Sequence, residues 1–137
     1  MDENLNLRFA GIDRLYGRGA VARLSGKQVC VVGLGGVGSW AVEALARSGV
    51  GSLVLVDADE VCVSNSNRQL HALDGQFGRG KAEVLAERCL AINPAIRVKV
   101  EARFLTPANL VELLDAGHDL VLDACDSFRS KVEMIAW

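Results

Sequence analysis

The sequence lacks several features that would place it in a specialised class of protein. Its cysteines stand alone, with no C-x-x-C pair, so a zinc site of the usual ligand spacing is excluded. No apolar run approaches the roughly 20 residues that cross a bilayer, and we expect no membrane span. The acidic, polar start, Met1-Asp2-Glu3-Asn4, lacks the chemistry of a signal peptide. These absences favour a cytoplasmic globular protein.

An excess of charge of one sign is also absent. The chain has 15 Lys and Arg residues against 17 Asp and Glu residues, which gives a formal net charge of −2. A protein with this balance has no overall electrostatic attraction for nucleic acid. Any contact with RNA must therefore be local.

The cysteines and His71 form no recognisable catalytic pattern. Cys30 and Cys89 fall on apolar faces, and we expect them to be buried as small hydrophobic side chains. Cys62 and Cys125 flank polar motifs, but neither has a histidine beside it, which disfavours a catalytic thiol. His71 has no partner in the sequence and is expected to be structural or exposed in a loop.

The hydrophobic pattern alternates strands with helices. Short apolar runs at 28–32 and 53–56 are typical of parallel strands buried on both faces. Between them we predict a helix, ended by Gly49 and Gly51, with an apolar face formed by Val37, Trp40, Ala41, Ala44 and Leu45. Residues 28–57 therefore predict one right-handed β-α-β unit.

The later segments continue this alternation. They comprise a helix closed by Asn93-Pro94, a more exposed strand at 97–101, a helix that begins at Thr106-Pro107, a strand at 120–123 and a helix from about Arg129 that still runs at the chain end. We predict an α/β fold: a Rossmann-like, doubly wound, mainly parallel sheet. The last helix has no following strand, so we also expect a sheet truncated at its C-terminal end.

A glycine-rich turn, Gly33-Leu34-Gly35-Gly36-Val37-Gly38-Ser39, joins the first predicted strand to its helix. The glycines of its G-x-G-x-x-G pattern permit positive φ and let the backbone approach a phosphate. The helix N-terminus adds N–H groups and partial positive charge. Asp57 ends the next strand, where a carboxylate binds ribose hydroxyls. We predict an adenine nucleotide site, with ATP as the favoured ligand, against the alternative of a tight turn without a ligand.

A polar segment at 59–80 is too long to be an idle connection. With the residue after it, this segment concentrates polar and cationic groups beyond the strand ends: Asp59, Asn65, Asn67, Arg68, Gln69 and Lys81. Arg68 and Lys81 suit the charge of a triphosphate better than that of a pyrophosphate diester, and could stabilise pyrophosphate as it leaves. Asp126 would lie at the same rim and could hold Mg²⁺ through water.

Each of these residues also has a plainer interpretation. Lys81 would then be a solvated lysine at a helix start, and Arg68 would pair with Asp59 on the surface. Asp123 and Asp126 would only cap the following helix. By composition alone, Arg8 and Arg14 are surface arginines.

Six ordered motifs carry a resemblance to a known family: G-L-G-G-V-G-S, L-V-L-V-D-A-D, S-N-S-N-R-Q, G-R-G-K, I-N-P and L-D-A-C-D-S. Together they resemble the ubiquitin-activating-like superfamily, which includes the ThiF, MoeB and HesA proteins and adenylates carboxylates with ATP and Mg²⁺. Within it, residues 8–17 and 59–73 look most like the tRNA threonylcarbamoyladenosine dehydratases. Those proteins use ATP to activate the carboxylate of the threonylcarbamoyl group on adenosine 37 of tRNA, which then closes into a cyclic form.

The resemblance implies a role for each matching position. Asp57 would bind the ribose and Asp126 would position Mg²⁺, while phosphates would contact Gly33, Gly35, Gly36, Gly38, Asn65, Arg68 and Lys81. Arg14 matches an arginine that reaches the ATP site of a partner subunit, which implies a homodimer. Residues 1–27 would then be a helical dimer arm, and 28–137 an incomplete ATP-binding Rossmann-like domain. A tRNA substrate and a sulfur-relay protein partner are also implied.

Other functions stay open at this point. The same motifs would serve adenylation of the C-terminus of a ubiquitin-like or sulfur-carrier protein. The glycine pattern with Asp57 would also serve an NAD-binding oxidoreductase. Because the family has a further half that this sequence lacks, a non-enzymatic nucleotide-sensing module is a third possibility.

Overall fold

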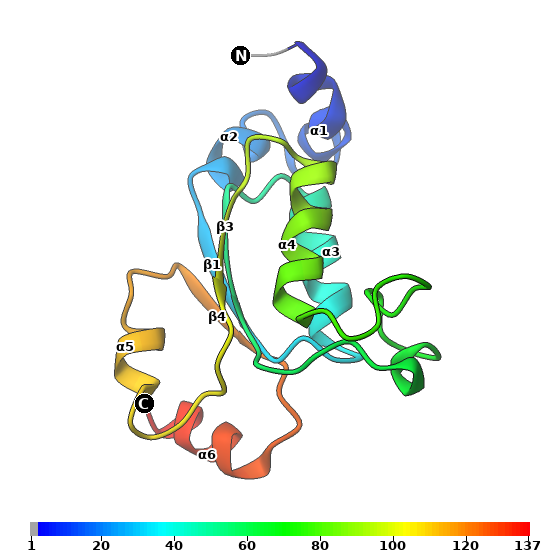
Figure 1. The fold of residues 1–137 in the computed structure, drawn as a ribbon. Coiled ribbons are helices and arrows are strands. Elements are labelled where there is room, and N and C mark those ends of the chain that lie inside the picture. The colour runs from blue at the N-terminus through cyan, green and yellow to red at the C-terminus, as the bar shows by residue number, and fades with distance from the viewer. Residues whose placement is uncertain (1–2) are drawn as a thin grey trace.

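A computed structural model describes residues 3–137, so the first two residues of the predicted 1–27 segment lie outside it. Four parallel strands form one sheet in the order β3-β2-β1-β4 (Figure 1). They are β1 (Gln28–Val32), β2 (Ser52–Val56), β3 (Arg97–Glu101) and β4 (Leu120–Asp123). The helices are α1 (Glu3–Tyr16), α2 (Ala20–Ser25), α3 (Gly38–Arg47), α4 (Lys81–Ile92), α5 (Leu110–Leu114) and α6 (Phe128–Ala136), with the 3₁₀ turn η1 (Val63–Asn65).

The alternation of side chains along β1 and β2 builds a core on each face of the sheet. Val29, Val31, Leu53 and Leu55 face one way and pack with apolar residues of α3 and α4. Cys30, Val32, Val54 and Val56 face the other way and pack with α5 and with Met134 of α6. Figure 1 shows the two helix layers on opposite sides of the sheet. The predicted doubly wound α/β fold is confirmed, with exposed β3 at an edge as predicted.

The apolar face predicted for α3 is only partly right, because, of its larger side chains, Leu45 alone packs against the core. Val37 and Trp40 are exposed, and the residues buried along the helix are Gly38, Ser39, Val42 and Ala46. Ser39 can face the core because its hydroxyl donates to the Gly35 carbonyl and accepts from the Leu70 N–H. The small side chains let α3 lie close to the sheet, which hydrophobicity alone did not indicate.

The start of α5 and the cap of α6 differ from the expectations, whereas α6 begins at Phe128, near Arg129 as predicted. Thr106 is not the N-cap of α5, because the Asn109 side chain accepts from the Thr106 N–H and donates to the Phe104 carbonyl, which folds this segment into a turn. The helix begins only at Leu110. At α6 the N-cap is Ser127, whose hydroxyl accepts from the Ser130 N–H. The capping interpretation of the preceding aspartates is therefore wrong.

Helices α1 and α2 lie at the end of the sheet where the strands begin, away from the glycine-rich turn (Figure 1). Phe9 of α1 packs beside Gly49, just after α3, and Arg8 donates to the carbonyl of Ile92, the last residue of α4. Within residues 3–137, none of the helices combines the length and apolar character needed to span a bilayer.

Candidate nucleotide-binding site

The glycine-rich turn is held in place by the sheet beneath it. Gly33 has φ +90°, and a Cβ there would lie 2.7 Å from the Cys125 backbone, so both the conformation and the close approach require glycine. The next N–H, of Leu34, donates to Asp57 Oδ2 over 2.8 Å. The other carboxylate oxygen of Asp57 accepts from the Asp59 N–H over 2.7 Å. Asp57 therefore orients both the turn and the start of the polar segment, and it is positioned at the edge of the cavity.

His71 holds the same turn from the other side. Its Nε2 lies 2.7 Å from the Leu34 carbonyl, and the ring is buried. Since a carbonyl only accepts, Nε2 carries the proton and donates. Nδ1 is then an unprotonated nitrogen, buried and without a partner among the described residues. Burial lowers the pKa of His71, so the ring is neutral at pH 7. Of the two predicted roles for His71, the structural one is confirmed.

The polar segment 59–80 is closed at its base by backbone hydrogen bonds. Lys81 donates its N–H to the Asp59 carbonyl, and Val61 exchanges hydrogen bonds with Gly78 and Arg79. This closure brings Lys81 to the end of β2, although Lys81 comes 24 positions after Asp57 in the sequence. Its side chain is only 8% exposed, and Nζ lies 3.8 Å from Asp59 Oδ2. The interpretation of Lys81 as a solvated lysine is therefore wrong.

Arg68 lies against the glycine-rich turn. A Cβ on Gly36 would stand 3.5 Å from Arg68 Cγ, and the Arg68 carbonyl accepts from the Trp40 indole. The guanidinium donates through Nη1 to the Ser64 carbonyl and to the Asn67 side chain. Its ion pair with Asp59, the plainer interpretation, is not found among residues 3–137, where Asp59 pairs with Lys81. Arg68 is thus held next to the glycine-rich turn.

The end of β4 forms the opposite wall. Asp123 pairs with Lys131 over 3.0 Å, and the Cys125 thiol donates to the same carboxylate oxygen. Burial and the nearby Asp123 raise the pKa of Cys125 to about 11. The thiol is therefore protonated at pH 7, which agrees with the prediction that it is not a nucleophile.

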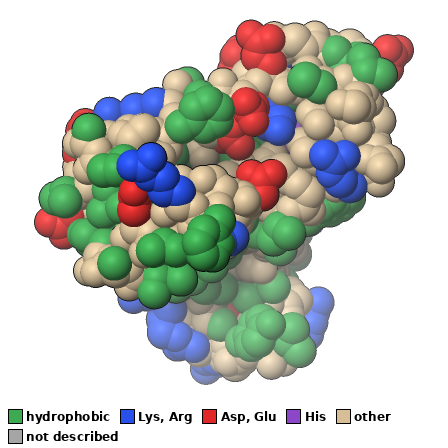
Figure 2. All heavy atoms as spheres, turned by 90° about the horizontal axis from the view of Figure 1, so that it is seen from below, with side chains coloured by type: hydrophobic (Ala, Val, Ile, Leu, Met, Phe, Trp, Pro, Cys, Tyr) green, Lys and Arg blue, Asp and Glu red, His purple; other side chains and the backbone are tan. Residues whose placement is uncertain are grey.

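These segments enclose a cavity of about 560 Å³ at the carboxyl ends of the strands. Eight of the predicted site residues line it: Gly33, Gly35, Gly36, Asp57, Asp59, Arg68, Lys81 and Asp126. Figure 2 views the molecule from this end and shows acidic and basic side chains close together. A cavity of this size is typical of a small-molecule site.

Three predicted residues do not line the cavity. Gly38 begins α3, where a Cβ would stand 1.7 Å from the Gly33 carbonyl oxygen, so this glycine shapes the turn. Asn65 accepts from the Cys62 N–H and stabilises η1. Arg14 is exposed on α1, at the far end of the sheet, so within one chain it cannot reach the cavity.

The donors around this cavity fit a nucleotide. The glycine turn and the start of α3 supply backbone N–H groups, and Arg68, Lys81 and Lys131 supply positive charge. For Mg²⁺ the fit is narrower. No cluster of three or more metal-ligating side chains occurs within residues 3–137, so a divalent ion here would need oxygen ligands from the nucleotide and water besides Asp126.

Sequence reasoning missed several lining residues. Phe104 and Leu105 come from the connection after β3, and Ser130 and Lys131 from the first turn of α6. Lys131 could have been predicted, because it lies in the first turn of the helix that follows the end of β4. A lysine there is expected at the same rim of the sheet. No local signal marked the connection after β3. Its place depends on how α5 packs against the sheet.

Comparison with known proteins agrees with this geometry. The model of the ThiF family matches residues 4–136. The tRNA threonylcarbamoyladenosine dehydratase of Escherichia coli is 52% identical over 95% of this chain, and that of Haemophilus influenzae is 48% identical over 98%. The molybdopterin-synthase adenylyltransferase of Escherichia coli is 41% identical over 82%.

Solved structures give the same result. Structures of the Escherichia coli dehydratase in complex with ATP and with AMP both superpose with a TM-score of 0.96 at 50% identity over 98% of this chain. This chain covers 56% and 55% of those two chains. It covers 48% and 52% of the two dehydratase sequences, so it spans about half the length of the curated relatives that it matches.

Proposed function

This chain belongs to the ThiF family, and on that premise we propose that its cavity binds ATP and Mg²⁺ for adenylation of a carboxylate. The observation that supports this most directly is the meeting of the glycine-rich turn, Arg68 and the buried Lys81 around one cavity. A buried lysine is costly unless an anion is near it, and Asp59 at 3.8 Å is a loose, partly exposed partner. A triphosphate would complete its surroundings, which argues against the NAD-binding alternative.

In the proposed reaction a substrate carboxylate attacks the α-phosphorus of ATP, and the bond to the β-phosphate breaks to release pyrophosphate. Backbone N–H groups of the turn and the α3 N-terminus would hold the phosphates. Arg68 and Lys81 would stabilise the negative charge that grows on pyrophosphate. Asp126 would orient the hydrated Mg²⁺, and Asp57 the ribose.

We further propose that the carboxylate is that of threonylcarbamoyladenosine 37 in tRNA. The support is the greater identity to the two dehydratases, 52% and 48%, than to the adenylyltransferase, 41%. After adenylation the substrate would close into its cyclic form and release AMP. A tRNA substrate would place the reaction in the cytoplasm.

We also propose a homodimer in which Arg14 completes the partner subunit's ATP site. The support is that Arg14 is an exposed arginine at the end of the molecule opposite its own cavity. A role as catalytic residue therefore requires a second subunit. A sulfur-relay protein partner remains a prediction from the resemblance, and the protonated state of Cys125 gives it no support.

The test is ATP-dependent formation of AMP and the cyclic nucleoside on tRNA that carries threonylcarbamoyladenosine. We expect Arg68→Ala to abolish the reaction nearly completely and Asp123→Asn, which removes only the charge that pairs with Lys131, to reduce it much less. Full turnover by the Arg68 variant would reject the proposed role. Adenylation of a sulfur-carrier C-terminus instead of tRNA would reject the proposed substrate.

A further inference from the structure

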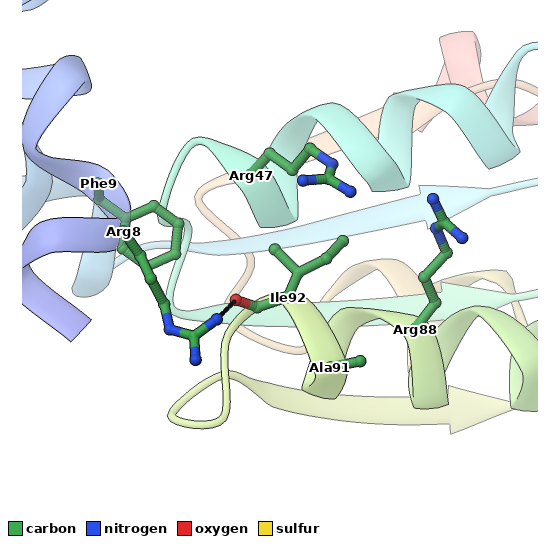
Figure 3. Close-up of a pocket in the computed structure, with 6 residues that line it drawn as sticks. All are labelled: Arg8, Phe9, Arg47, Arg88, Ala91 and Ile92. Carbon is green, nitrogen blue, oxygen red and sulfur yellow. Dashed lines mark hydrogen bonds between the residues drawn. The ribbon is translucent and has the colours of Figure 1, made fainter. Parts of the chain in front are cut away.

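A second cavity, of about 370 Å³, lies at the end of the molecule opposite the nucleotide site. Its lining contains three arginines and no carboxylate: Arg8, Phe9, Arg47, Arg88, Ala91 and Ile92. Figure 3 shows that Arg47 of α3 and Arg88 of α4 extend into the space between the two helices, while Arg8 of α1 reaches the last turn of α4. Three helices thus bring positive charge to one hollow, on the apolar base of Phe9 and Ile92.

Only some of the guanidinium N–H groups of these three arginines donate hydrogen bonds within the protein. Glu43 accepts from Arg47 Nε and from both Nε and Nη2 of Arg88. One carboxylate therefore faces two guanidinium groups. Their hydrogen bonds, of which that from Arg88 has the larger effect, lower the pKa of Glu43. Arg8 uses Nη1 for the Ile92 carbonyl, which offsets the partial negative charge where α4 ends. Within residues 3–137, no hydrogen bond from the Nη groups of Arg47 is found. Several donors therefore remain for an anion.

Helix α3 connects this hollow to the nucleotide cavity. It begins at Gly38 beside the phosphate loop and ends at Arg47, and its ten residues correspond to about 15 Å. Trp40, 54% exposed, lies on the same side of α3, one and two turns before Glu43 and Arg47. Its indole donates to the Arg68 carbonyl at the cavity rim. An exposed aromatic ring between two cationic groups is typical of a surface that contacts an RNA chain.

We propose that Arg8, Arg47 and Arg88 bind a phosphate of the RNA backbone while another nucleotide of the same RNA occupies the reaction site. This inference rests on the proposed tRNA substrate. The net charge of −2 provides no general attraction for RNA, so a local cationic cluster has to supply it. A contact about 15 Å from the phosphate loop would fix the orientation of the RNA without touching the reacting atoms.

The test is a fluorescence anisotropy titration of a labelled anticodon stem-loop RNA against the full chain, over a series of salt concentrations. Arg47→Gln removes one charge and one i,i+4 pair, with Glu43. Arg129→Gln is the matched control, because Arg129 is 82% exposed and also forms an i,i+4 pair, with Glu133. We expect Arg47→Gln to weaken RNA binding about five- to eightfold at 0.1 M salt and to reduce the salt slope by about one. The control should change neither.

Two further measurements separate the possible failures. ATP affinity should be the same in both variants, which shows that the fold and nucleotide site are intact. If Arg47→Gln and the double variant R8Q/R47Q both bind RNA as tightly as the wild type does, the proposal is overturned and the proposed function still stands. Inorganic phosphate is titrated against the same variants. If the variants lose phosphate binding but keep RNA binding, the hollow binds a small anion, and the proposal is again overturned. ATP binding without any RNA binding by the wild type contradicts the tRNA substrate itself.

Discussion

The carboxylate of Asp57 accepts the backbone N–H of Leu34 over 2.8 Å, and this hydrogen bond joins the end of β2 to the glycine-rich turn after β1. His71 holds the carbonyl of the same residue over 2.7 Å. Both sides of Leu34 are therefore fixed from outside the turn. The neighbouring N–H groups are oriented before a ligand arrives, which reduces the entropy lost on binding.

Substitutions at two glycines of the turn should affect stability and ATP binding differently. In Gly38→Ala the new Cβ would meet the Gly33 carbonyl oxygen at 1.7 Å, so we expect a loss of about 2–3 kcal/mol in the free energy of unfolding. In Gly36→Ala its nearest neighbour is the flexible Arg68 side chain at 3.5 Å, so stability should change by about 0.5 kcal/mol or less. The methyl group would still obstruct a phosphate. Urea unfolding and ATP titration of both variants check this, and normal ATP affinity in Gly36→Ala would contradict it.

His71 should make stability depend on pH. Its pKa is lowered in the folded state, mainly by burial, whereas in the unfolded chain it is near 6.5. Below that pH the unfolded state binds more protons than the folded state, so the free energy of unfolding falls as the pH falls. His71→Gln should be less stable at neutral pH and should lose this contribution to the slope as the pH falls below about 6.5. Identical slopes in urea unfolding of both proteins would refute the prediction.

The thiols should differ in reactivity with iodoacetamide at neutral pH. Burial raises the pKa of Cys30 and of Cys89 to about 12, and that of Cys125 to about 11, whereas Cys62 is exposed. Because the thiolate is the reactive form, native protein should be labelled first at Cys62. Peptide mass spectrometry gives the order. Rapid labelling of Cys125 would indicate a thiol activated by a group that the structure does not place beside it.

Lys81 should contribute to binding far more than a comparable surface lysine. Lys81→Met keeps the length of the buried side chain but removes its charge, and we expect ATP to bind at least about tenfold more weakly. Lys27→Met is the matched control, because Lys27 also forms a long ion pair, 3.7 Å from Asp119, but is half exposed at the opposite end of β1. Calorimetric titration should show a normal ATP affinity for the control. Equal losses in the two variants would mean a general charge effect.

Much of this architecture could be predicted because it is local. The strand at 28–32, the glycine turn and Asp57 each follow from a short pattern, and the structure places them as expected. The errors arise where hydrogen bonds between side chains and the backbone decide the local structure. Asn109 delays the start of α5 through side-chain hydrogen bonds, and Ser39 is buried because its hydroxyl serves two backbone groups. Hydrophobic periodicity carries no information on such contacts.

The polar segment shows the same limit within the site. Its composition predicted function, but not which residues reach the cavity. Asn65 turns to the Cys62 N–H, whereas Gln69 lines the cavity with its Oε1 buried and without a partner in the described part of the chain. The two amides are chemically alike, so the composition of the segment could not distinguish them.

Calorimetric titration of the chain with ATP, with and without Mg²⁺, and with NADH in parallel, tests the nucleotide assignment most directly. We predict one ATP per chain, tighter binding when Mg²⁺ is present, and a smaller Mg²⁺ effect in Asp126→Asn. Binding of NADH in the micromolar range with no heat from ATP would contradict the assignment, because Arg68 and Lys81 would then surround a ligand without a triphosphate.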